Sequence, residues 1–175
     1  MLIDAAKVRA LILDATIAKQ VDELRVSPSY KLRSEMRAYL DKHNRGAGTK
    51  NNVFDQLKLL SNPGGVSLIN LGIPSLDRTS EAFILPSGSR LTFGVTIRDH
   101  GDTASLISYR FQIQFPQNHH PSYLRFDLIH RQHEAPLRES RCHLHPGTGD
   151  IRIPIPVLTP LEILDRIFFV FEPSI

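Results

Sequence analysis

Residues 105–115 alternate between apolar and polar side chains, which is typical of a strand with one buried face. The apolar positions are Tyr109, Phe111, Ile113 and Phe115, and the polar positions between them are Arg110, Gln112 and Gln114. Residues 123–131 and 141–145 repeat the pattern, and Cys142 and Leu144 fall on the apolar side of the latter. Shorter strands are expected at 66–70, 82–85 and 90–98. Because the apolar face needs a cover, we predict an antiparallel sheet with helices on one face.

The first 60 residues carry a different pattern, with apolar residues recurring at spacings of three and four. A first helix is expected over 4–25. Ser27 and Pro28 together predict the start of a second helix. The apolar stripe of that helix consists of Leu32, Met36, Tyr39 and Leu40. Asn52 is expected to open a short helix through Leu60. Residues 1–60 are therefore predicted to form a helical region.

The segment 61–65, Ser-Asn-Pro-Gly-Gly, is the strongest break in the chain, and we expect a boundary there. Residues 61–175 would form the sheet together with a C-terminal helix. Thr159 and Glu162 are spaced as a capping box, which predicts that this helix runs to about Phe171. The expected fold class is α+β, with the helical region 1–60 packed against the antiparallel sheet of 61–175. The helical region is expected to serve dimerisation or partner binding.

Composition narrows the class of protein. The chain has 175 residues and a net charge of +3, which is compatible with nucleic acid without arguing for it. A single cysteine excludes an internal disulfide and any multi-cysteine zinc site. No apolar run reaches the roughly 18 residues that a membrane span needs, and the N-terminal stretch lacks the features of a signal peptide. We therefore expect a cytoplasmic protein without membrane contact. We also expect no cofactor.

The polar face of the expected sheet carries side chains that bind phosphates and move protons. If the best three strands are neighbours, this face holds Arg110, Gln112, Gln114, Arg125, Asp127, Arg141, His143 and His145. A solvated sheet face is the plain alternative, since alternation alone predicts one. The functional alternative is a metal-free ribonuclease. Such an enzyme needs a base for the 2′-OH proton, an acid for the leaving oxygen and a cation for the phosphorane charge. A histidine pair with Arg125 or Arg141 could supply all three.

His143 and His145 also suit a metal, because two histidines two residues apart on a strand project to the same side. A third ligand would then have to come from Asp150, His130 or His133. We keep this metal-dependent alternative open, although acid–base chemistry without a metal is preferred.

The second half of the chain resembles the TumE-like family, small ribonuclease toxins of bacterial toxin–antitoxin pairs. The resemblance rests on Tyr109-Arg110-Phe111, Leu124-Arg125-Phe126-Asp127, the histidine-rich stretch from His130 to His145 and Leu161-Glu162-Ile163-Leu164. It implies a metal-independent endoribonuclease in which His143 or His145 is the base or the acid, Arg125 and Arg141 hold the phosphate and Asp127 orients an arginine or a histidine. The expected substrate contacts are Arg110, Arg141, His130 and His133. The first 60 residues would then bind a neutralising antitoxin or a second copy of the chain.

A binding module is the competing hypothesis. The same polar face could hold RNA or a partner protein without catalysing a reaction. Geometry discriminates between the two: histidines and arginines that converge on one concave spot favour the enzyme, and a flat, dispersed arrangement favours binding.

Overall fold

A computed structural model describes residues 24–44, 51–72, 82–129, 141–147 and 151–171. The expected first helix (4–25) lies almost wholly outside these residues, as do His130, His133 and Asp150. Nine strands of the described residues form one antiparallel sheet, and its main order is β2-β3-β5-β6-β7-β8-β9. The long central strands are β5 (Arg90–Asp99), β6 (Ala104–Gln114) and β7 (Tyr123–Leu128). The α+β class predicted from the sequence is confirmed.

Shorter strands complete the sheet on both sides of this centre. They are β1 (Arg25–Val26), β2 (Leu57–Asn62), β3 (Val66–Leu71), β4 (Phe83–Ile84), β8 (Cys142–Pro146) and β9 (Ile153–Pro154). β1 pairs with the start of β6, and β4 pairs with the start of β5. β9 lies at the end of the strand order, as expected for a strand that contains a proline.

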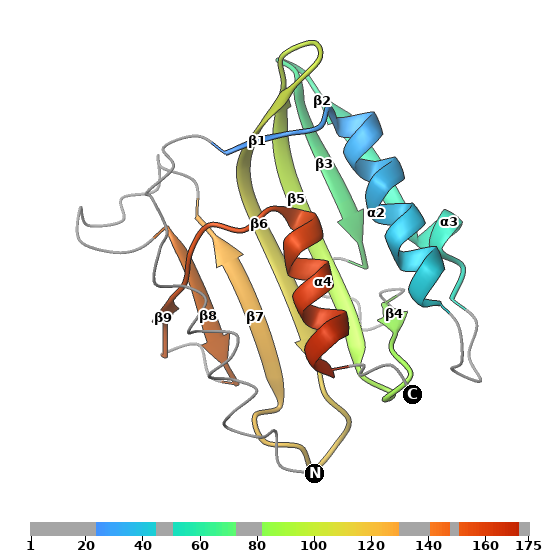
Figure 1. Cartoon of the computed structure of the whole chain (residues 1–175), viewed down its shortest axis with the longest axis vertical. Helices are drawn as coiled ribbons and strands as arrows, with labels where there is room; N and C mark the ends of the chain where they lie inside the picture. Colours follow the sequence, from blue (N-terminus) through green and yellow to red (C-terminus); the bar gives the residue numbers. More distant parts are fainter. Residues whose placement is uncertain (1–23, 45–50, 73–81, 130–140, 148–150, 172–175) are drawn as a thin grey trace.

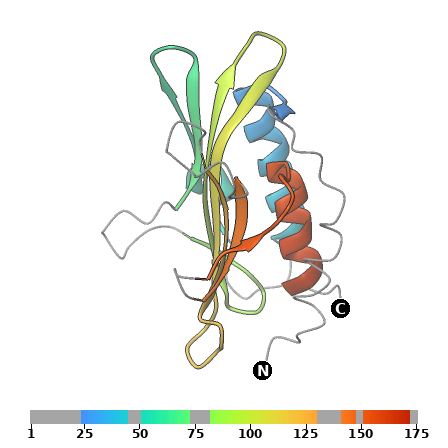
Figure 2. The same ribbon diagram turned by 90° about the vertical axis from the view of Figure 1, so that its left-hand side faces the viewer.

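Helices cover one face of the sheet. α2 (Ser29–His43) and α4 (Pro160–Phe171) lie side by side on that face, whereas no helix of the described residues lies on the other (Figures 1 and 2). The core fills the space between the two layers and includes Phe83, Phe93, Phe111 and Phe126 from the strands and Ile163, Leu164, Ile167 and Phe168 from α4. The alternation therefore leaves the polar side chains of the strands on the uncovered face.

The apolar stripe of α2 is buried as predicted, since Leu32, Met36 and Leu40 are at most 2% exposed. The first residue of the helix lies one position later in the sequence than predicted. The helix begins at Ser29, whose backbone N–H donates to the Asp99 carboxylate at 2.7 Å. Asp99 also accepts a hydrogen bond from Ser67 Oγ at 3.1 Å. A side chain at the end of β5 thus takes the place of the expected Ser27 cap.

The capping box of α4 forms as predicted. Glu162 N–H donates to Thr159 Oγ1 at 3.2 Å, and the Glu162 carboxylate accepts from the Thr159 backbone N–H at 2.7 Å. Two backbone donors at the start of the helix are thereby satisfied. No helix of the described residues is long and apolar enough to cross a membrane.

The helix expected over 52–60 is largely wrong. Only α3 (Val53–Gln56) is helical, and Leu57–Asn62 forms β2. β2 pairs with β3 along its whole length, from Leu57 opposite Leu71 to Asn62 opposite Val66. The expected boundary at 61–65 falls at the turn of this hairpin, where Gly64 and Gly65 adopt positive φ angles that other residues disfavour. Pairing along the sheet edge here outweighs the helical pattern of the local sequence.

Candidate functional site

The register of the sheet places the polar side chains in two rows that run across the strands. One row consists of Thr92, Gln112, Arg125 and His145, each directly opposite the next. The other row consists of Gly94, Arg110, Asp127 and His143. Because directly opposed residues in a sheet have Cβ atoms about 5 Å apart, each row brings together side chains that are distant in the sequence.

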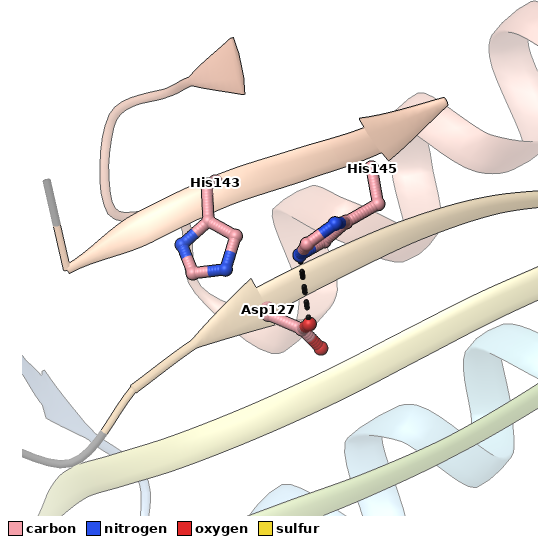
Figure 3. Close-up of side chains that lie close together, drawn as sticks. All are labelled: Asp127, His143 and His145. Carbon is pink, nitrogen blue, oxygen red and sulfur yellow. Dashed lines mark ion pairs between the residues drawn. The ribbon is translucent and has the colours of Figure 1, made fainter. Parts of the chain in front are cut away.

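Asp127 is the centre of the second row. It is 6% exposed, and its carboxylate accepts hydrogen bonds from Arg125 Nε at 2.8 Å and from Arg110 Nε at 3.1 Å. His145 Nε2 lies 3.3 Å from the carboxylate oxygen that Arg125 contacts. Figure 3 shows both histidines on β8 beside Asp127 on β7. Asp127 therefore holds two guanidiniums and faces one imidazole.

His145 is almost completely buried, at 2% exposure. Burial lowers its pKa, and the Arg125 guanidinium lowers the pKa further, while Asp127 opposes both effects. The neutral imidazole is therefore favoured at neutral pH. Neither ring nitrogen completes a hydrogen bond within the part of the chain that the structure describes. A neutral imidazole with an unoccupied nitrogen is able to accept a proton.

His143 lies beside His145 on the same face of β8. The ring centroids are 4.8 Å apart and the planes are inclined by 70°. His143 is 6% exposed and, like His145, lines a pocket on the uncovered face of the sheet. Two imidazoles with different surroundings thus lie within one pocket, an arrangement that is suited to general acid–base chemistry.

The pocket has a volume of about 590 Å³ and two chemically distinct ends. We call one the charged end, lined by Arg110, Arg125, Asp127, His143, His145 and Arg152. We call the other the neutral end, lined by Leu68, Thr92, Gly94, Thr96 and Ser108. Gln112 lies between them, opposite Thr92 on β5 and Arg125 on β7. Three guanidiniums and one carboxylate give the charged end an excess of positive charge, which favours anions over cations.

Five of the residues predicted from the sequence meet in this pocket, namely Arg110, Arg125, Asp127, His143 and His145. Arg141, expected to hold a phosphate, does not line it. Arg141 precedes β8, and its Nε donates to the Ile129 carbonyl at 3.4 Å. Arg152, which the sequence analysis missed, lines the pocket instead. One further step of the β8–β9 register places Arg152 opposite His145. The sequence signal for Arg152 was its position between Ile151 and Ile153, in a stretch that alternates apolar and polar residues.

The carboxylate and the two histidines could also be considered as metal ligands. One ligand atom each from Asp127, His143 and His145 lies within 4.8 Å of the others. The third member is thus Asp127, whereas the sequence analysis considered Asp150, His130 or His133. However, Arg110 and Arg125 already occupy both oxygens of the carboxylate. A divalent cation would have to displace a guanidinium and remain close to it, so these residues fit a metal poorly.

No family model, curated protein or solved structure matches the chain. The resemblance to the TumE-like family therefore rests on the residues quoted for it.

Proposed function

We propose that the protein is a metal-independent endoribonuclease whose active site is the charged end of the pocket. The observation that carries the proposal is the convergence of two histidines, three arginines and a buried aspartate in one concavity. They come from β6, β7, β8 and the segment before β9. A solvated sheet face would give no reason to bury His145 with both ring nitrogens lacking a hydrogen bond, because burying unsatisfied polar atoms costs free energy.

The proposed reaction is attack of the ribose 2′-oxygen on the adjacent phosphorus. The bond from phosphorus to the 5′-oxygen breaks, which leaves a 2′,3′-cyclic phosphate and a free 5′-hydroxyl. His145 takes the proton of the 2′-hydroxyl, because burial and Arg125 keep its pKa low and its ring neutral. His143 gives a proton to the leaving 5′-oxygen. Each proton transfer of this kind contributes about 10²- to 10⁴-fold to the rate.

The arginines bind the phosphate and stabilise the charge that develops on it. The Arg110 side chain is 59% exposed, so it can turn from Asp127 to a phosphate at little cost. Arg125 is held more firmly, with its side chain 21% exposed and its Nε 2.8 Å from the carboxylate. Movement of these guanidiniums toward the substrate would open access to the nitrogens of His145. Asp127 then positions the guanidiniums and His145 without contacting the substrate.

The test is cleavage of a fluorescent single-stranded RNA in the presence of EDTA. We expect cleavage by the wild type and a loss of about 10²-fold or more in His143→Ala and in His145→Ala. His100→Ala is the matched control, because His100 lies in the turn between β5 and β6, outside the pocket. Thermal unfolding of each variant checks that the fold is retained.

Three outcomes would contradict the proposal. They are no cleavage by the wild type, cleavage that disappears when EDTA is added, and full cleavage by a His143→Ala/His145→Ala double variant. Binding of RNA without cleavage would favour the non-catalytic binding module. Analysis of the products adds a further check, since a metal-independent reaction of this kind must leave a cyclic phosphate.

A further inference from the structure

The pocket is larger than the charged end needs. Its volume of about 590 Å³ falls in the range of about 300–1,000 Å³ that pockets for small organic ligands have. A phosphate group alone would leave most of this space empty. The remaining space extends across β6 toward β5 and β3, where the neutral end begins.

The neutral end is lined by hydroxyl groups, and it includes a glycine at which the pocket is deepest. Thr92 and Thr96 flank Gly94 on β5, and Ser108 on β6 is directly opposite Thr96. Gly94 lies opposite Arg110 and carries no side chain, so the floor of the pocket is lowest beside the charged end. Leu68 of β3, opposite Thr96, adds an apolar wall. Hydroxyls that donate and accept, beside an apolar surface, suit a heterocycle with polar edges.

From this arrangement we infer that the neutral end binds the base and ribose of one unpaired nucleotide, whose phosphate lies at the charged end. The inference rests on the proposed function and names its substrate as single-stranded RNA. A base in a duplex is stacked and paired, so it cannot enter a pocket of this kind without being extruded. Gln112, at the junction of the two ends, can both donate and accept hydrogen bonds from its amide. It is therefore placed to read the edge of the base nearest the phosphate.

The experiment compares binding of inorganic phosphate with binding of uridine 3′-monophosphate and adenosine 3′-monophosphate by calorimetry. We expect at least one nucleotide to bind about tenfold or more tightly than phosphate, which corresponds to roughly two additional hydrogen bonds. In a Thr96→Leu/Ser108→Leu variant, leucine side chains fill the neutral end. We expect this variant to lose the tenfold preference while its affinity for phosphate stays within about twofold of the wild type.

If the double variant does not fold, two single substitutions that alter the structure less provide the same test. Thr92→Val replaces a pocket hydroxyl by a methyl group, and Thr103→Val makes the same change in the β5–β6 turn, outside the pocket. Only the former should weaken nucleotide binding, by severalfold. Valine is favoured in strands such as β5, and Thr103 is exposed in its turn, so both variants should fold.

Two results would overturn the inference. One is equal affinity of the wild type for phosphate and for both nucleotides. The other is a nucleotide preference that survives in the folded Thr96→Leu/Ser108→Leu variant or, if that variant does not fold, in Thr92→Val. Failure of the proposed function gives a different pattern. In that case the wild type binds nucleotides through the neutral end but leaves RNA intact.

Discussion

Replacing Asp127 by asparagine tests whether this carboxylate holds the charged end together. The substitution keeps the size of the side chain and removes its charge. Asparagine Oδ1 can still accept a hydrogen bond from one of the two guanidiniums, Arg110 or Arg125. Its Nδ2 is a donor and would face the other guanidinium, which is also a donor. One partner is therefore lost, and one ion pair becomes a hydrogen bond from a charged guanidinium to a neutral amide oxygen.

The expected loss of stability follows from how exposed each pair is. The Arg125 side chain is 21% exposed and its Nε lies 2.8 Å from Asp127, so this pair should contribute close to the 1.5–3 kcal/mol of a hydrogen bond to a charged group. The Arg110 pair is discounted, because the Arg110 side chain is 59% exposed and well screened by water. Together these give a decrease of about 2 kcal/mol in the free energy of unfolding.

The measurement is urea denaturation followed by circular dichroism, supported by thermal unfolding. A decrease of about 2 kcal/mol corresponds to about 4–8 °C in Tm for a chain of this size. Asp41→Asn is the matched control, because Asp41 forms an ion pair with Arg37 in which both side chains are at least 39% exposed. That exposed pair should contribute at most about 0.5 kcal/mol. If Asp127→Asn is no more destabilising than Asp41→Asn, the assigned role of Asp127 is refuted.

Two further predictions concern the fold. Asp99→Ala should lower the free energy of unfolding by about 1–2 kcal/mol, because it removes the acceptor for Ser29 N–H at the start of α2; a loss below about 0.3 kcal/mol in urea denaturation would contradict this role. Burial lowers the pKa of both His43 and His145 in the folded protein, so the unfolded chain takes up protons first as the pH falls. Stability should therefore be full above the ordinary histidine pKa and decline as the pH falls below about 6.5, and His43→Gln should reduce that decline. Constant or rising stability as the pH falls below this value would be evidence against it.

The sequence predicted which side chains share a face more reliably than which side chains meet. Alternation in β7, in β8 and in β6 from Ser108 onward was sufficient to place Arg110, Asp127 and His143 on the face opposite the core. Contact across strands depends on register, which alternation leaves free in steps of two residues. Arg141 shares the expected face, but it lies before the first residue of β8 and contacts Ile129. Arg152 was missed because the pairing of a two-residue edge strand leaves little trace in the sequence.

Helix prediction failed where a tertiary partner decided the local structure. Residues 52–60 have a good cap in Asn52 and a helical apolar pattern, yet the helix ends at Gln56. Leu57 is fully buried in β2. The two glycines after Pro63 let the chain reverse and pair with β3, and this long-range pairing outweighs a weak local preference. The same logic explains α2, which is capped from β5 by Asp99 instead of by its own sequence.

The two polar rows also determine when, during synthesis, the charged end can first exist. β5, β6 and β7 emerge from the ribosome before β8, so an incomplete chain presents Asp127 with its arginines and neither histidine of the pair. His143 and His145 join only when β8 docks beside β7 in the correct register, and Arg152 follows with the segment before β9. The histidine pair and the Asp127 carboxylate are therefore carried by different, successively made parts of the chain. In the proposed mechanism, a nascent chain that has not yet made β8 would lack both of the groups that transfer protons.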